Sequence, residues 1–222
     1  MYLPSHFAVP EREALHRLIA EQPLGALVTQ GADGGLDANH LPFELDTARG
    51  AHGTLRGHVA RANPVWQQVA SGSEVLVIFR AGDAYISPSW YPSKHENHRS
   101  VPTWNYRVVH AHGRLIIRDD ERYVRGVVAR LTRQHEASQP KPWRMTDAPP
   151  DYIATLLQAI VGIEVEITRL EGKFKLSQNR EPRDIRGAAE ALRQQHKQHP
   201  QQQPGESAIA DAMQAPRPDA GG

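Results

Sequence analysis

The stretch "LGALVTQGADGGLDANHLPFEL", residues 24–45, carries the pattern on which the predicted fold depends. Its first residues, Leu24 to Thr29, are mostly apolar and predict a buried strand. The following "GADGG" contains the glycine and aspartate residues that tight turns require. "LDANHLPFEL" then predicts a second strand, in which Pro42 indicates a sheet edge or a bulge because proline cannot donate to a strand ladder.

The rest of the chain continues this order of strand, turn and strand. Further strands are predicted at residues 54–60, 74–79, 83–87, 106–117 and 162–176. A turn "RAGD" is predicted between the strands at 74–79 and 83–87, and a bulge at Gly113. Helices are predicted near Glu11 to Glu21 and Asp120 to His135, with shorter ones at 62–70 and 151–160. Because the strands follow one another directly and the helices lie outside that run, we expect a mainly β fold with peripheral helices, an antiparallel barrel and not a βαβ sheet.

The C-terminal segment has a different composition. From about Gln194 onward the chain is rich in Gln, Pro, Gly and Ala. Such a segment cannot bury enough apolar surface to offset the entropy lost on ordering, so we expect it to be mostly disordered, with one turn of helix around Ile209.

Composition excludes several classes of protein. The 222 residues are 39% hydrophobic and 23% charged, and no apolar run approaches the roughly 20 residues that cross a bilayer. The start, "MYLPSHFAVP", lacks the pattern of a signal peptide, and cysteine is absent, so we expect a cytoplasmic protein without disulfides or membrane contact. The 26 Lys and Arg against 25 Asp and Glu leave no basic excess of the kind that dedicated nucleic-acid binders carry.

The histidines do not predict a metal site. His95 and His98 form an H-x-x-H pair, and His110 and His112 form an H-x-H pair on one face of a strand. Neither pair has an evident third ligand, so we expect solvated or hydrogen-bonded histidines and no metal. The sequence also contains no G-x-S-x-G and no P-loop, and no catalytic residue is predicted.

"GHVARANPVW", residues 57–66, predicts either an anion site or an ordinary helix start. A strand ends near His58 and Val59, and Asn63 with Pro64 begins a helix. Arg61 and the N–H groups of that helix start could together hold a phosphate. Alternatively, Asn63 only caps the helix and Arg61 is a surface charge.

"GKFKLSQNR", residues 172–180, gathers hydrogen-bond donors after a strand. Lys173 and Lys175 share one face, and polar residues follow from Ser177 to Arg180. The cluster could hold an anionic ligand. The alternative is a sheet edge protected by lysines, which explains the lysines but not the residues that follow them.

"SWYPSKHENHRSVPTWNY", residues 89–106, concentrates aromatic side chains in one stretch. It contains Trp90, Tyr91, Trp104 and Tyr106. Aromatic residues stabilise mainly when buried, so they predict either part of the core or the wall of a site for a flat ligand.

Six segments resemble the signature segments of one family, PaiB. They are "MYLPSHF", "ANHLPF", "GHVARANPVW", "AYISPSWYPSK", "VPTWNYRVVHAHG" and "EGKFKLSQNR". PaiB proteins are described as FMN-binding transcriptional regulators with an FMN-binding split-barrel fold. The resemblance covers Met1 to about Arg180, and it does not extend to "KHENHRS" or the Gln-rich tail. It implies a split-barrel domain at residues 1–180 and a C-terminal helix with a largely disordered tail at 181–222.

The resemblance also implies a homodimer with FMN in a cleft between two barrels. By comparison with related oxidases, Arg61 and Asn63 would contact the phosphate, and the strand from Asn39 to Pro42 would flank the isoalloxazine ring. Trp90, Tyr91, Trp104 and Tyr106 would line or close the flavin pocket and the dimer seam around it. The full set of expected FMN contacts is Asn39, His40, Leu41, Pro42, His58, Val59, Arg61, Asn63, Trp104 and Asn105. A second pocket is expected where the oxidases grip their substrate phosphate, formed by Lys175, Ser177, Asn179 and Arg180, although the His and Asp of the oxidase segment are absent.

These implications lead to one expected function and two alternatives. We expect an FMN-binding homodimeric negative transcriptional regulator, whose partners are a second copy of the chain, FMN, and DNA or another regulator. The first alternative is a flavin-dependent oxidoreductase of the pyridoxamine-phosphate-oxidase or haem-degrading type, so enzymatic activity stays open. The second is a dimerisation module without a ligand. The regulator label rests on the resemblance, since fold does not determine function.

Overall fold

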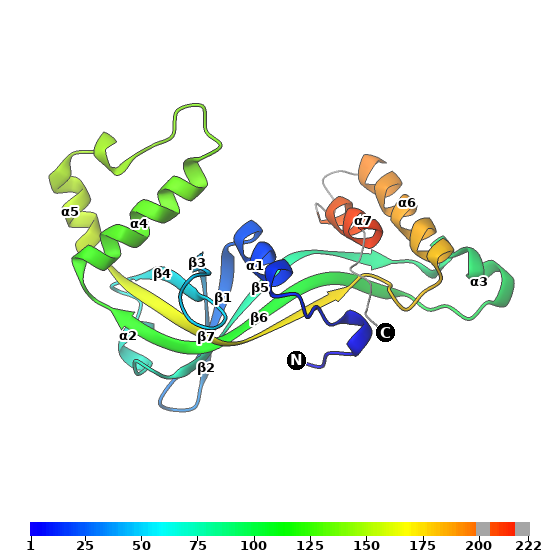
Figure 1. Ribbon diagram of the computed structural model, residues 1–222, viewed down its shortest axis with the longest axis horizontal. Helices are drawn as coiled ribbons and strands as arrows, with labels where there is room; N and C mark the ends of the chain where they lie inside the picture. Colours follow the sequence, from blue (N-terminus) through cyan, green and yellow to red (C-terminus); the bar gives the residue numbers. More distant parts are fainter. Residues whose placement is uncertain (199–204, 216–222) are drawn as a thin grey trace. The chain divides into compact units, whose positions relative to one another are not determined.

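The computed structural model describes residues 1–198 and 205–215 of the chain (Figure 1). Its elements follow in this order: η1 Ser5–Phe7, α1 Arg12–Glu21, β1 Leu24–Gln30, β2 Leu36–Pro42, β3 Glu44–Asp46, β4 Thr54–Ala60, α2 Val65–Gln68, β5 Glu74–Ile86, η2 Pro88–Trp90, α3 Pro92–Asn97, β6 Thr103–Arg118, α4 Glu121–Glu136, η3 Met145–Asp147, α5 Pro150–Gln158, β7 Ile160–Lys175, α6 Pro182–Gln198 and α7 Glu206–Gln214. The predicted helices at 11–21 and 120–135 are confirmed as α1 and α4. Within the described residues, no helix is long and apolar enough to cross a membrane.

The sheet closes on itself at Phe43. In the described part of the chain, seven strands are ordered β2-β1-β5-β6-β7-β4-β3, and β1 and β4 each pair antiparallel with both neighbours. The two strands at opposite ends of this order, β2 and β3, are separated in the chain by Phe43 alone. The two ends of the sheet must therefore meet at this residue, which gives a barrel. The predicted antiparallel barrel with peripheral helices is confirmed.

The hairpin at residues 24–42 forms as predicted. β1 and β2 pair from Leu24 opposite Pro42 to Gln30 opposite Leu36. In the turn, Gly34 has a φ of 81°, and the Gly35 N–H donates to Asp33 Oδ1 at 2.9 Å, so the turn needs its glycine and its aspartate. The strand breaks after Pro42, where an edge or a bulge is predicted.

The chain divides into two compact units. The barrel unit comprises Glu11–Phe79 and Val109–Leu170, and the hairpin unit comprises Met1–Pro10, Arg80–Val108 and the residues from Glu171 onward. The strands β5, β6 and β7 supply residues to both units. The boundary that the sequence predicts at residue 180 stays a prediction.

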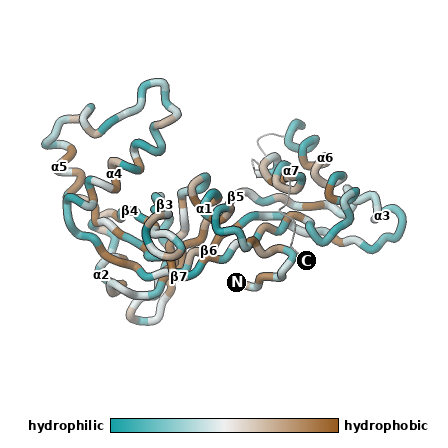
Figure 2. The backbone as a smooth tube through the Cα atoms, viewed as in Figure 1, coloured by the Kyte–Doolittle hydropathy of each residue, from teal (hydrophilic) through white to brown (hydrophobic). Residues whose placement is uncertain are grey.

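The core of the barrel unit comes from alternate residues of its strands and from one face of α1. Leu27, Leu55 and Val77 are fully buried. In Figure 2 hydrophobic and hydrophilic segments mix along the strands, while the loop between α4 and α5 is mostly hydrophilic. On α1 the buried residues are Leu15, Leu18 and Ile19, at the spacing of one helical face. Each such side chain contributes about 1.5–3 kcal/mol when fully buried.

In the hairpin unit, α6 and α7 lie side by side over one apolar cluster (Figure 1). From α7, Ile209 and Met213 are buried together with Leu192 of α6 and Ile86 of β5. Helix α7 is therefore longer than the single turn expected around Ile209, because its apolar residues lie on one face and find a partner surface. The first residues of the tail expected to be disordered, Gln194 to Gln198, are also ordered, because they continue the helix α6. The rest of that tail, 199–204 and 216–222, lies outside the described residues.

Two predictions about the strands are wrong. Residues 74–79 and 83–87 form one strand, β5, because Gly82, with a φ of 71°, shifts the alternation of buried residues without reversing the chain. The buried side chains therefore fall on odd-numbered residues as far as Ala81 and on even-numbered residues from Ala84. Gly113 is not a bulge: the buried positions of β6 alternate through it, and a Cβ there would lie 2.4 Å from the Glu166 carbonyl oxygen. This glycine allows two strands to approach closely.

Candidate functional site

Arg61 is held in a fixed orientation at the end of β4. Its backbone N–H donates to the Ala159 carbonyl at 2.8 Å. Its side-chain Nε donates to the Gln158 carbonyl at 2.7 Å, and Nη2 donates to the Ile160 carbonyl at 3.3 Å. The guanidinium carbon also lies 5.6 Å from the ring centre of Trp66, whose indole N–H donates to the Arg61 carbonyl. These contacts orient the guanidinium before any ligand is present.

The outer edge of the Arg61 guanidinium is occupied by Asp119. Nη1 donates to one carboxylate oxygen at 3.0 Å and Nη2 to the other at 2.6 Å, a bidentate arrangement. The side chains are 40% and 43% exposed, so the pair lies at the surface. The hydrogen bond from Arg61 lowers the pKa of Asp119, and the same bond raises the pKa of Arg61. Both groups are therefore charged at neutral pH.

Asn39 and Asn63, expected in one site, are brought together. Asn63 Nδ2 donates to Asn39 Oδ1 at 2.6 Å, and Asn63 Oδ1 accepts from the Val65 N–H at 3.0 Å. Asn39 in turn donates to Asp37 at 2.8 Å. Asn63 bonds to the Val65 N–H at the start of α2, as the predicted cap would, although Pro64 stands at the N-cap position. Because α2 has four residues and the Val65 N–H is already bonded, the start of this helix offers few free N–H groups to a phosphate. Of the two expected phosphate contacts, Arg61 and Asn63, only Arg61 carries a positive charge.

The other residues expected around the flavin in the barrel unit differ in exposure. His40 is exposed, Leu41 and Pro42 are half-buried, and Val59 is buried in the core. His58 is half-buried, and its buried Nδ1 has no hydrogen-bond partner among the described residues. Burial lowers the pKa of His58, so this ring is neutral at physiological pH. A neutral imidazole nitrogen without a partner is one polar contact that a ligand could complete.

Trp104 and Asn105 lie in the hairpin unit and point to different environments. Trp104 is 49% exposed and packs edge-on against Tyr85, with ring centres 5.9 Å apart. Asn105 is fully buried and donates to Ser177 Oγ at 3.0 Å and to Met213 Sδ at 3.4 Å. Asn105 therefore lies beneath α7, where a ligand could reach it only if that helix moved. Tyr91 is also fully buried, so for this residue the core interpretation holds.

The four residues of the expected second pocket do not converge on one open space. Lys175 donates to Thr103 Oγ1 and to the Trp104 carbonyl, and burial lowers its pKa. Ser177, with a φ of 64°, is buried with Asn105. The Arg180 guanidinium lies 5.1 Å from the centre of the buried Tyr91 ring, and Asn179 is exposed. These side chains mainly hold the end of β7 in place, and a substrate role for them stays a prediction.

The structure also contains an open groove of about 300 Å³ in the barrel unit that the sequence did not predict. Apolar side chains from β1 and β5 and polar ones from β5 and β7 line it, among them Val28, Leu76, Glu74, Thr168 and Arg169. This volume is at the lower end of the range for small-molecule sites. The alternation of apolar and polar residues along each strand could have indicated which side chains point outward. It could not have indicated which strands are neighbours and so form the groove.

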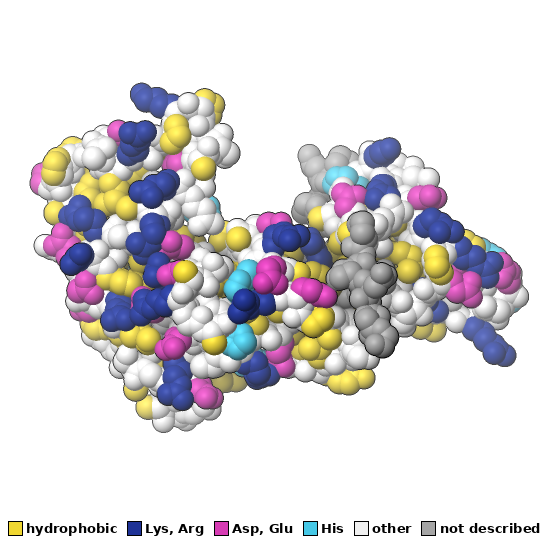
Figure 3. Space-filling model, in the orientation of Figure 1, with side chains coloured by type: hydrophobic (Ala, Val, Ile, Leu, Met, Phe, Trp, Pro, Cys, Tyr) yellow, Lys and Arg dark blue, Asp and Glu magenta, His cyan; other side chains and the backbone are white. Residues whose placement is uncertain are grey.

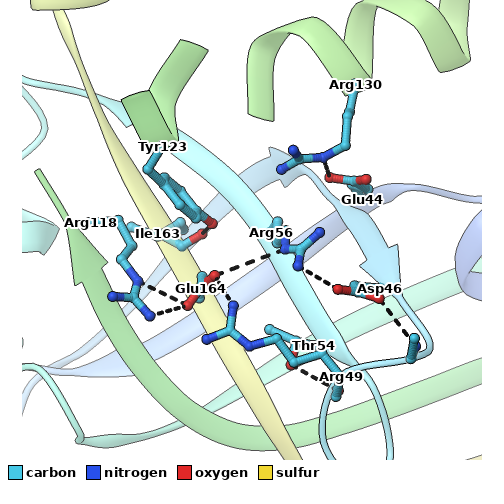
Figure 4. A network of polar contacts seen from close by, with 11 residues as sticks. Glu44, Asp46, Arg49, Thr54, Arg56, Arg118, Tyr123, Arg130, Ile163 and Glu164 are labelled. Carbon is cyan, nitrogen blue, oxygen red and sulfur yellow. Dashed lines mark hydrogen bonds and ion pairs between the residues drawn. The ribbon is translucent and has the colours of Figure 1, made fainter. Parts of the chain in front are cut away.

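A buried carboxylate, Glu164, is surrounded by arginines from three segments (Figure 4). It is 1% exposed and pairs with Arg49 at 2.6 Å and with Arg118 at 2.8 Å, while Arg56 lies 3.9 Å away and also pairs with Asp46. The three arginines come from the β3–β4 loop, β4 and β6, and they join these elements to β7. We assign this network to stability, since its carboxylate is enclosed by its partners.

The residues at the Arg61 corner suit an anionic ligand such as the phosphate of FMN. The guanidinium is oriented by two carbonyls, and its outer edge already binds a carboxylate. Asn39 on β2, His58 on β4 and Asn63 in the segment after β4 add polar atoms. Sequence reasoning missed Asp119. Two aspartates, Asp119 and Asp120, precede α4 in the sequence, and a helix start needs one of them as a cap. Asp120 is that cap, because it accepts from the Tyr123 N–H, so the second aspartate was the available sign of another role.

Comparison with known proteins places these residues in a family. A family model described as "Putative FMN-binding domain" matches residues 1–169, which include Asn39, Arg61, Asn63 and Asp119. The chain is 31% identical over 192 residues to "Protease synthase and sporulation protein PAI 2" of Bacillus subtilis (strain 168), covering 86% of this chain and 89% of that protein. It is 34% identical over 212 residues to "Uncharacterized protein AN0679" of Emericella nidulans, covering 80% of this chain and 84% of that protein.

Among solved structures, the chain is similar to a "putative 5-nitroimidazole antibiotic resistance protein" from Bacteroides thetaiotaomicron. The TM-score is 0.52 at 13% identity, over 75% of this chain and 85% of that one. Identity this low shows the fold alone. Together with the closed antiparallel sheet, the likeness confirms the FMN-binding split barrel that the motifs imply. The chain belongs to the family described as "Putative FMN-binding domain", with the PaiB-type motifs that its sequence displays.

Proposed function

We propose that this protein is an FMN-binding homodimer that acts as a negative transcriptional regulator, and that Arg61 holds the FMN phosphate. The observation that carries the cofactor assignment is the oriented guanidinium of Arg61, inside the segment that matches the FMN-binding family. A guanidinium edge that donates two parallel hydrogen bonds to a carboxylate can donate the same pair to a phosphate.

Different residues of the barrel unit would bind different parts of FMN. Arg61 and Asn63 would contact the phosphate, and the strand from Asn39 to Pro42 would lie along the isoalloxazine ring. When bound, FMN supplies hydride or single-electron chemistry through that ring. Leu41 and Pro42 offer half-buried apolar surface to the ring, and His58 offers the buried nitrogen without a partner. In this proposal the chain binds, orients and shields the cofactor.

The homodimer is supported by the outward face of the barrel sheet. On β1 the outward residues Leu24, Ala26 and Val28 are apolar, and Leu24 is 63% exposed. The outward positions Leu76 and Ile78 of β5, the strand paired with β1, are apolar as well. Apolar residues repeated on the outer face of neighbouring strands are typical of a surface that a second protein covers. We propose a second copy of the chain as that protein.

The regulatory part of the proposal is supported by the name of the Bacillus subtilis relative, which links that protein to protease synthesis and sporulation. The charge pattern favours regulation through a bound ligand or another protein over broad contact with DNA phosphates. On the face seen in Figure 3, Lys and Arg side chains alternate with acidic and hydrophobic ones and form no continuous stripe. Dedicated DNA binders usually display such a stripe.

Three experiments test the parts of this proposal and its alternative. Titration of the purified protein with FMN and with riboflavin, followed by flavin fluorescence, tests the cofactor site. Electrophoretic mobility and its salt dependence with promoter DNA test direct regulation, because phosphate contacts give a steep loss of affinity with salt. Anaerobic mixing of the FMN complex with pyridoxamine phosphate tests the oxidase alternative. Bleaching of the flavin band there would replace the regulator by an enzyme.

A further inference from the structure

We propose that Asp119 competes internally for the phosphate-binding edge of Arg61, so that a phosphate-bearing ligand enters by displacing this carboxylate. The proposal rests on the proposed function, in which Arg61 is the phosphate contact. It adds a residue that sets how strongly the chain prefers a phosphorylated flavin over an unphosphorylated one. The proposal is based on two edges of the Arg61 guanidinium. The inner edge, Nε and Nη2, donates to backbone carbonyls, and the outer edge, Nη1 and Nη2, donates to Asp119.

The inner edge is fixed by the backbone. Nε and Nη2 donate to the carbonyls of Gln158 and Ile160, which flank the start of β7. Trp66 lies beside the guanidinium and donates to the Arg61 carbonyl. None of these contacts involves a carboxylate, so they persist when Asp119 leaves. The guanidinium then stays oriented, with its outer N–H groups facing solvent.

The outer edge is exchangeable. Asp119 and Arg61 are each about 40% exposed, and exposed ion pairs contribute little to stability. Among the described residues Asp119 bonds to Arg61 alone, because the neighbouring Asp120 makes the cap of α4. Asp119 can therefore turn toward water without loosening the helix that follows it.

A phosphate and the Asp119 carboxylate cannot use this edge together. Both are anions that accept two parallel N–H bonds from one guanidinium, and the edge has room for one such acceptor. Placing them side by side would add like-charge repulsion. Asp119 therefore weakens binding of any phosphate-bearing ligand here and leaves binding of an uncharged flavin unaffected.

The test compares Asp119→Asn with the wild type in titrations with FMN and riboflavin. Removing the negative charge should tighten FMN binding about 1.5- to fivefold, the range expected when a surface ion pair no longer competes. Riboflavin affinity should not change. Glu96→Gln is the matched control, because Glu96 makes a bidentate exposed pair with Arg183, at 2.5 and 2.7 Å, in the hairpin unit. It should alter neither titration.

The results separate this inference from the proposed function. If the wild type binds FMN but Asp119→Asn binds it equally or more weakly, Asp119 does not compete and the inference is wrong while the cofactor assignment stands. If the wild type binds neither flavin, the cofactor assignment is wrong, and inorganic phosphate decides the inference. Phosphate should then raise the melting temperature of Asp119→Asn more than that of the wild type, at constant ionic strength. An equal rise would overturn it.

A second variant shows whether the gain depends on the Arg61 edge. Arg61→Lys keeps the positive charge but lacks the planar pair of donors. In the Arg61→Lys background, adding Asp119→Asn should increase the affinity for FMN or phosphate much less than it does in the wild type. If the double variant keeps the full gain, the effect of Asp119 comes from general charge and not from competition for Arg61, which contradicts the proposal.

Discussion

Replacing Glu164 by Gln should destabilise the protein strongly, although Glu164 touches none of the proposed flavin contacts. The substitution keeps the shape of the side chain and removes its charge. Arg49 and Arg118 would then face an amide whose N–H₂ group cannot accept from them, and Arg56 would retain only Asp46 (Figure 4). Positive charge would remain around a site that has lost its counter-charge.

The expected loss in the free energy of unfolding follows from how deeply Glu164 and its arginine partners are buried. Breaking a fully buried ion pair costs about 3–5 kcal/mol. Glu164 is 1% exposed, but Arg118 and Arg49 are 37% and 44% exposed and can turn partly toward water. The expected loss is therefore about 2–4 kcal/mol in the free energy of unfolding. For a chain of this size it corresponds to a fall of about 5–15 °C in melting temperature.

The assay is urea unfolding followed by tryptophan fluorescence and circular dichroism. The midpoint should fall while the m-value stays constant, because the surface exposed on unfolding does not change. The matched control is Glu166→Gln, the same change two residues further along β7 at an exposed position, which should cost less than about 0.5 kcal/mol. Equal and small losses in both variants would refute the account of Glu164 as a buried counter-charge.

Two further predictions concern the dimer and the Arg61–Asp119 pair. Leu24→Asp, on the outward face of β1, should shift the protein from dimer to monomer in sedimentation velocity; an unchanged sedimentation coefficient would exclude this face as the interface. The Asp119 pKa is lowered in the folded state, so its pair with Arg61 stabilises the protein above the unfolded pKa, about 3.9, and this stabilisation is lost as pH falls through the folded pKa. The stability difference between wild type and Asp119→Asn should be constant from pH 6 to 8 and vanish in acid, and a difference that persists in acid would contradict it.

Local sequence patterns predicted the parts of the fold that depend on neighbours in the chain. The hairpin at 24–42 followed from its glycines and its apolar alternation, and α1 followed from one helical stripe. Pro42 indicated the irregularity at which the barrel closes. The strand β5 was misread because "RAGD" has the composition of a turn, and only the sheet shows that Gly82 bends the strand without reversing it.

The site was harder to predict because its partners are distant in sequence. Asn39 and Asn63 were assigned to one site through the family motifs, and the structure joins them by a hydrogen bond, while their role in binding stays a prediction. The pairing of Arg61 with Asp119 spans 58 positions, and no local pattern indicates it. Asn105 was expected to contact the ligand because no local pattern shows that α7 covers it. Met213 of α7, which accepts from Asn105, lies more than a hundred residues further along the chain.

The most direct test of the central claim is the affinity of the wild type and of Arg61→Ala for FMN and for riboflavin, measured by the quenching of flavin fluorescence. The account predicts that the wild type binds FMN more tightly than riboflavin. It also predicts that Arg61→Ala loses about ten- to a hundredfold in FMN affinity, the worth of one or two charge-assisted hydrogen bonds, with riboflavin little changed. Equal losses for both flavins, with the melting temperature lowered, would show that Arg61 acts through folding. Equal affinity of the wild type for both would contradict a phosphate site at this residue.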